Sequence, residues 1–178
     1  KHIFAAGDVA SGPQFTHIAG YHAGIIIRNI CFKMPAKVDY KALPWVTYTD
    51  TELANVGLTH AQALEKHGES KIKTISWPFE ENDRAQCEKH TAGLIKITAC
   101  NNGKILGAAI VGPHAGELIG IWSLAITKGM KLKDITGIIA PYPTFGEISK
   151  RVAGSWFTPS LFSDKTRKIV GLLKKLPF

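Results

Sequence analysis

The chain has 178 residues, a net charge of +8 and 45% hydrophobic residues. This length suits one ordinary domain, or one domain with a piece of another, and the hydrophobic content excludes a disordered chain. The positive charge favours anionic partners in general. The sequence has no RNA- or DNA-reading motif, so we expect no nucleic-acid partner.

The three cysteines, Cys31, Cys87 and Cys100, lie far apart and form no CxxC or metal-ligand spacing. This pattern is typical of unpaired thiols in a reducing compartment, and we expect a cytoplasmic protein. His17 and His22 are too far out of phase to share one metal-binding helix face, so no metal site is predicted. The apolar stretches are too interrupted to span a bilayer.

The first 42 residues predict the tail end of an α/β unit. An apolar run that closes with Gly7 and Asp8 favours a buried strand, and a Gly/Pro/Ser loop follows. Residues 15–32 carry apolar side chains at helical spacing and predict a helix, and residues 35–41 have the composition of a linker. Such a unit has too little core to fold alone.

The sequence pattern changes at residue 43, and the new pattern continues to residue 157. Asn102-Gly103 lies between two apolar runs and gives the strongest hairpin signal in the chain. Alternating or apolar runs predict strands at 45–50, 53–58, 71–79, 93–100 and 104–113, and residues 80–92 predict a loop or helical turn. Helical spacing predicts helices at 60–68 after a Thr59 cap, at 115–129, at 131–139 and at 145–156 after a Thr144 cap. The sum is an α+β domain, an antiparallel sheet with helices on one face.

Residues 158–178 form a basic amphipathic tail in which lysine and arginine alternate with leucine, isoleucine and valine. Such a segment can lie on an anionic membrane surface. The alternative is a terminal helix that packs on its own dimer. Both interpretations stay open at this level.

Several residues could carry chemistry. Asp8 stands at the end of the predicted strand, where its carboxylate could accept hydrogen bonds from a polyol, or simply cap the next segment. His114 and Glu117 flank the start of a predicted helix, where a carboxylate is favourable without any catalytic role. Tyr142 and Glu147 form a second candidate pair, because a carboxylate can orient a phenol or a water. The alternative is a packed loop tyrosine beside a glutamate that neutralises a helix start.

Taken in order, these motifs resemble one family, the FAD-dependent pyridine nucleotide–disulfide oxidoreductases. The segment "HIFAAGDV" is similar to the last FAD-binding strand of that family, with Gly7 and Asp8 beside the ribityl chain. The segment "QFTHIAGYHAG" resembles the next helix, and the match implies that Phe15, Thr16 and His17 lie nearest the flavin. "LPWVTYTDTELANVGLTHAQA" and "GKILGAAIVGPHAGELI" resemble the C-terminal dimerisation domain.

The same resemblance gives Tyr142 and Glu147 a role. Disulfide reductases of the family carry His-Pro-Thr here, with a glutamate four residues after the proline, and the histidine is the acid/base for a dithiol across the dimer. This chain reads Tyr142-Pro143-Thr144 with Glu147 at the glutamate position, as mercuric reductases do with their tyrosine. It has no cysteine after Cys100, so the match does not extend to the C-terminal cysteine pair of mercuric reductases.

The resemblance implies a C-terminal fragment divided into a FAD-domain remnant (1–42), a dimerisation domain (43–157) and the tail (158–178). Its parent would be a homodimer that uses FAD and NAD(P)H, while the fragment itself is expected to bind neither and to be inactive. No GxGxxG and no CxxxxC occur in the sequence, and both are expected upstream of Lys1. The alternative is a stand-alone dimerisation module with no catalytic activity.

Overall fold

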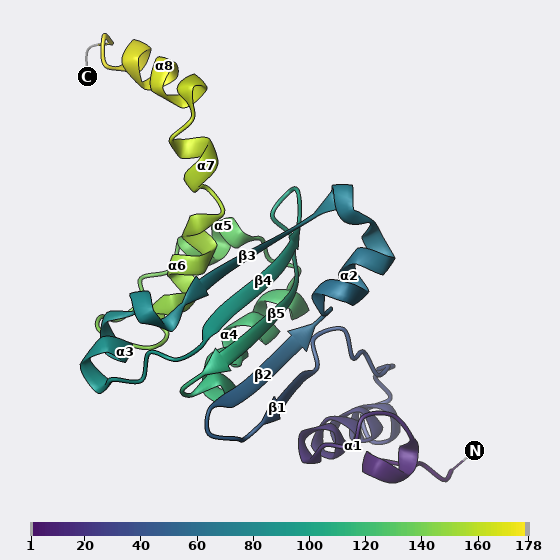
Figure 1. Cartoon of the computed structure of the whole chain (residues 1–178). Coiled ribbons are helices and arrows are strands. Elements are labelled where there is room, and N and C mark those ends of the chain that lie inside the picture. Colours follow the sequence, from purple (N-terminus) through teal and green to yellow (C-terminus); the bar gives the residue numbers. More distant parts are fainter. Residues whose placement is uncertain (1, 177–178) are drawn as a thin grey trace. The chain divides into compact units, whose positions relative to one another are not determined.

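The computed structural model describes residues 2–176, and the chain divides into two compact units, Lys1–Tyr40 and Lys41–Phe178. Figure 1 shows a short N-terminal unit with one long helix and a second unit built on an antiparallel sheet.

The first unit consists of a 3-10 helix, Gly7–Ala10, and the helix α1, Thr16–Ile30. The predicted helix is confirmed, but the predicted strand before it is wrong, because residues 2–6 are irregular and lead directly into the 3-10 helix. A strand needs a neighbouring strand for its backbone groups, and none of the described residues of this unit is in a strand. The apolar run therefore has no sheet to join here.

The second unit contains a five-stranded antiparallel sheet in the order β1-β2-β5-β4-β3. The strands are β1 Pro44–Thr47, β2 Glu52–Gly57, β3 Ile72–Pro78, β4 Leu94–Cys100 and β5 Ile105–Gly112. The helices of four or more residues are α2 His60–His67, α3 Asp83–Glu88, α4 Ala115–Thr127, α5 Leu132–Thr136, α6 Glu147–Ser155, α7 Thr158–Leu161 and α8 Asp164–Leu173. The predicted α+β class, the strands and the Asn102-Gly103 hairpin are confirmed.

The hydrophobic core lies against one face of the sheet. Because side chains alternate across a strand, Ile95 and Ile97 of β4 and Ile110 of β5 point to the same side, and all three are fully buried. Helix α4 contacts β1, β2 and β5 on this side, and α6 contacts β3 and β4. Helix α2 starts over the opposite face, where His60 Nδ1 lies 2.9 Å from Thr74 Oγ1. The Thr59 cap of α2 is confirmed as a capping box with Gln62.

Trp122 joins the two core helices. Its side chain in α4 is fully buried, and its indole Nε1 donates a hydrogen bond of 3.2 Å to Ser149 Oγ in α6. Ser149 is itself 1% exposed. The position of α6, and with it the loop that precedes α6, therefore depends on α4.

The predicted Thr144 cap is wrong. Helix α6 begins at Glu147 with Gly146 in the cap position, and no side chain caps it. Thr144 Oγ1 instead donates a 2.8 Å hydrogen bond to the carbonyl oxygen of Pro141 inside the loop. A threonine hydroxyl offers the backbone this local alternative to capping, and the loop before α6 uses it.

Candidate functional site

The loop between α5 and α6 carries Tyr142, followed by a cis peptide bond to Pro143. Two contacts fix this loop to the segment after β3. Phe145 packs edge-on against the fully buried Phe79, with 6.2 Å between ring centroids. Asn82 Nδ2 donates a 3.1 Å hydrogen bond to the carbonyl oxygen of Thr144. Residues that are distant in sequence are thereby brought together at one end of the sheet.

Asn82 is the centre of this attachment. It is 2% exposed, and its Oδ1 accepts a 3.0 Å hydrogen bond from the amide of Ala85, which caps α3. One side chain therefore starts α3 and holds the Tyr142 loop against it. The cap places Asp83, the first residue of α3, beside the loop.

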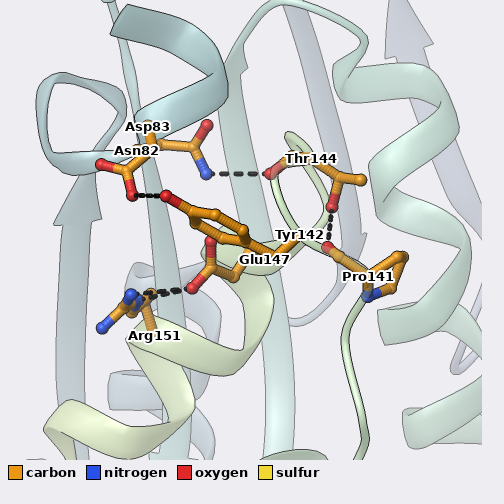
Figure 2. Close-up of polar contacts among 7 residues, drawn as sticks. All are labelled: Asn82, Asp83, Pro141, Tyr142, Thr144, Glu147 and Arg151. Atoms are coloured by element: carbon orange, nitrogen blue, oxygen red, sulfur yellow. Dashed lines mark hydrogen bonds and ion pairs between the residues drawn. The ribbon is translucent and has the colours of Figure 1, made fainter.

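Tyr142 and Asp83 form a direct pair (Figure 2). The Tyr142 hydroxyl donates a 2.8 Å hydrogen bond to Asp83 Oδ2, and 67% of the tyrosine side chain is exposed. The hydrogen bond to Asp83, and next the charge of its carboxylate, raise the pKa of Tyr142 above its ordinary value of 10.0. The charge of Glu147 adds a smaller effect in the same direction. Tyr142 is thus held as a neutral phenol, accessible from outside.

Glu147 has a different partner. Both Arg151 Nε, at 2.9 Å, and Arg151 Nη2, at 2.8 Å, bind Glu147 Oε1, one turn along α6. The Glu147 side chain is 13% exposed, and Figure 2 shows it beneath the ring of Tyr142. The sequence suggests that Glu147 orients the phenol or a water, whereas in the structure Asp83 accepts the hydrogen bond of the Tyr142 hydroxyl.

The Tyr142–Asp83 pair gives a titration that can be measured. Replacing Asp83 with asparagine removes a negative charge beside the hydroxyl, so the phenolate becomes less unfavourable and the pKa of Tyr142 should fall. We expect ultraviolet tyrosinate titration of Asp83→Asn to show one tyrosine ionising earlier than in the parent chain. Tyr142→Phe must remove that transition, and an unchanged titration would contradict the pairing.

The residues expected beside a flavin lie in the first unit. Gly7 is buried with φ +70°, and a Cβ there would lie 3.1 Å from Ala19 Cβ, so the turn packs closely against α1. The Gly7 amide donates a 3.1 Å hydrogen bond to His22 Nδ1. Asp8 is exposed in the first turn of the 3-10 helix. This packing holds the Asp8 turn against α1.

The other flavin-side candidates begin α1. Phe15 is the N-cap residue, Thr16 and His17 form the first turn, and the rings of Phe15 and His17 stack with centroids 5.2 Å apart. The first amides of a helix point out of its N-terminal end and carry partial positive charge. Such an end can hold an anionic or electron-rich ring edge. Gly7, Asp8, Phe15, Thr16 and His17 therefore share one unit, while Tyr142 and Glu147 belong to the other.

His114 and Glu117 are positioned by helix α4. His114 precedes α4 in a left-handed conformation with φ 58°, and its ring lies 5.2 Å from that of Phe145. Glu117 stands in the first turn, while Glu52 Oε2 accepts a 2.8 Å hydrogen bond from the Gly116 amide. These contacts support the structural interpretation of the pair, a carboxylate at a helix start beside a packed histidine.

Sequence reasoning missed Asn82 and Asp83, because residues 80–92 were expected to be loop or helical turn. The available signal was asparagine before "DRAQCE", a cap residue followed by a short polar helix. Between residues 2 and 176, no group of three or more His, Cys, Asp or Glu side chains is arranged to hold a metal ion. Nor, over the same residues, is any helix both long and apolar enough to cross a membrane.

Comparison with known proteins identifies the second unit. The family described as "Pyridine nucleotide-disulphide oxidoreductase, dimerisation domain" matches residues 43–153. A mercuric reductase of Lysinibacillus sphaericus is 40% identical over 85% of this chain and 28% of its own length. A dihydrolipoyl dehydrogenase of Bacillus subtilis is 40% identical over 85% of this chain and 32% of its own length.

Solved structures agree with the sequence matches. The HOCl-induced flavoprotein disulfide reductase RclA from Escherichia coli has a TM-score of 0.79 and 25% identity over 85% of this chain and 35% of its own. The chain thus spans only 28% to 35% of the length of these three proteins. The predicted family and fold are confirmed: the chain belongs to the pyridine nucleotide-disulphide oxidoreductases and carries their dimerisation domain over residues 43–153.

Proposed function

We propose that this chain is the C-terminal dimerisation portion of a flavoprotein oxidoreductase. The parent would pass electrons from NAD(P)H through FAD, and through a cysteine pair, to a disulfide, a metal ion or a related acceptor. The family match over residues 43–153 carries this proposal. Tyr142, which the family resemblance aligns with the acid/base histidine, is an exposed phenol fixed by Asp83, and this supports the proposal.

Two regions of the chain would serve that parent. Asp8 would accept hydrogen bonds from the ribityl hydroxyls of FAD, with Gly7 allowing close approach and Phe15, Thr16 and His17 facing the flavin ring edge. FAD would supply the electron transfer. The described residues provide only one wall of such a site, so the 178-residue chain is proposed to bind neither cofactor and to be inactive alone.

In the second unit, Tyr142 would reach the active site of the partner subunit. With its proton donated to Asp83, the Tyr142 oxygen would offer a lone pair to a thiol S–H or to a metal ion. Glu147 would add negative charge beneath the ring. The three cysteines are unpaired thiols, which supports a reducing compartment such as the cytoplasm.

A stand-alone dimerisation module remains the second candidate, since Lys41–Phe178 forms a compact unit with its own core. The two candidates differ in a cheap observation. The enzyme proposal predicts a yellow full-length parent, whose flavin absorbance bleaches with NADH or NADPH. The module proposal predicts a colourless dimer whose natural reading frame holds neither Gly-rich fingerprint nor cysteine pair.

Glu147→Gln in the full-length enzyme should lower turnover about tenfold. The substitution removes the carboxylate charge that lies near the Tyr142 phenol while a proton is transferred in the reaction. Flavin absorbance should stay unchanged. Arg151→Gln is the matched control, since it breaks the same ion pair and leaves the carboxylate in place. Equal losses in both variants would show that only the ion pair matters, and loss of flavin would contradict the assigned role.

Tyr142→His in the full-length enzyme should raise activity towards small disulfides, because an imidazole with a pKa near neutrality exchanges protons far more readily than a phenol. Turnover with a small disulfide under saturating NADH or NADPH measures this. If activity does not rise, Tyr142 does not stand where the proposal needs it.

A further inference from the structure

Helix α8, Asp164–Leu173, and the turn after it have an unpartnered apolar face. No residue of α8 is buried. The aliphatic side chains here are roughly half or more exposed, namely Ile169 48%, Val170 42%, Leu172 66%, Leu173 56% and Leu176 62%. On a helix of 3.6 residues per turn, Ile169, Leu172, Leu173 and Leu176 fall on one side.

Most of the cationic side chains lie outside this apolar side. By helical spacing Arg167, Lys174 and Lys175 lie on the side away from the leucines, Lys168 borders the apolar side one turn before Leu172, and Lys165 lies one turn before Ile169. Asp164 is the one acid between residues 164 and 176. Its carboxylate lies 3.7 Å from Arg167, with both side chains largely exposed, so the pair leaves the segment strongly positive.

The N-terminus of helix α8 is capped within its own segment. Ser163 caps it, because its hydroxyl accepts a hydrogen bond of 3.2 Å from the Thr166 amide. Two more large apolar side chains, Leu161 at 59% and Phe162 at 69% exposed, precede the cap. A preformed helix with an apolar stripe and a basic opposite face has the composition of an interfacial membrane helix.

The positive charge of this segment favours an anionic bilayer over a second copy of the chain as the partner of its apolar face. The same tail of a second copy would bring its lysines and arginine towards the cations of this helix. A bilayer with anionic headgroups offers a hydrocarbon boundary for the leucines and phosphates for the lysines at once. We propose that residues 161–176 dock the protein peripherally on an anionic membrane surface, independently of the oxidoreductase chemistry.

Vesicle sedimentation of the 178-residue chain tests the proposal. We expect binding to phosphatidylcholine vesicles that contain phosphatidylglycerol and little binding to phosphatidylcholine alone. Raising the ionic strength from 0.01 M to 0.15 M should weaken binding, because the Debye length falls from about 30 Å to about 8 Å. Equal binding to both kinds of vesicle, or none to either, would overturn the proposal.

Two double variants test the basic side and the apolar side of α8 separately. Lys168→Gln with Lys174→Gln should weaken binding about 25-fold, at about fivefold for each cation. Leu172→Ala with Leu173→Ala should weaken it on the order of tenfold or more, and alanine keeps the helix. Because no α8 side chain is buried, both variants should fold like the parent chain, which thermal unfolding checks.

Matched controls come from the sheet domain. Lys128→Gln removes an exposed lysine, and Leu124→Ala removes a leucine that is 55% exposed, both outside the tail. Each should leave vesicle binding unchanged. If the tail variants instead shift the chain from dimer to monomer in sedimentation equilibrium without vesicles, a second copy covers the face and membrane docking is wrong.

Discussion

Trp122→Ala should lower the free energy of unfolding by about 3–5 kcal/mol, the usual range for removing a buried tryptophan side chain. The Trp122 side chain is fully buried, and its hydrogen bond to Ser149 joins α4 to α6. Removal of the indole by the alanine substitution leaves a cavity that the surrounding helices and sheet fill only in part. Denaturant unfolding followed by circular dichroism measures the loss.

Ser149→Ala provides the control for that prediction. It removes only the acceptor of the indole hydrogen bond, so it should cost about 0.5–1.5 kcal/mol, or slightly more for the orphaned N–H group. A Trp122→Ala loss no larger than the Ser149→Ala loss would mean that the indole does not fill the core as described.

Asn82→Ala should cost about 2–4 kcal/mol. The change removes the cap of α3, worth about 1 kcal/mol, and leaves the Thr144 carbonyl without its donor, worth about 1–3 kcal/mol. It should also free the Tyr142 loop from α3, so the pKa of Tyr142 should fall towards its ordinary value. Denaturant unfolding and tyrosinate titration measure the two effects.

Asn82→Asp isolates the second contact. An aspartate still accepts from the Ala85 amide and keeps the cap, but it cannot donate to Thr144. We expect an intermediate loss of stability with α3 retained. Wild-type stability in Asn82→Asp would show that the Thr144 hydrogen bond does not hold the loop.

Most of the sheet could be predicted because its signals are local. Asn102-Gly103 fixes a hairpin, and Thr59 with Gln62 fixes the start of α2, within a few residues of sequence. One failure arose where a distant partner decides the structure, and the other where two local hydrogen bonds compete for one side chain. The run before Gly7 has strand composition but no neighbouring strand in its unit, and Thr144 bonds Pro141 instead of capping α6.

The candidate site was predictable only in part, for the same reason. Tyr142 and Glu147 could be proposed from the family resemblance, since they stand five positions apart in one segment. Their partners could not all be found this way. Asp83 lies 59 positions from Tyr142, and the contact exists because Asn82 joins two segments that only the folded sheet brings together.

The direction of the Tyr142 hydrogen bond limits what can approach this residue. A phenol has one proton, and Tyr142 directs it at Asp83. The oxygen therefore presents only lone pairs to its exposed side. A neutral thiol or an amide N–H would be accepted there, whereas a thiolate or carboxylate would meet both those lone pairs and the charge of Asp83. Tyr142 as held in this chain thus selects hydrogen-bond donors, and an anion gains access only when the phenol turns away from Asp83.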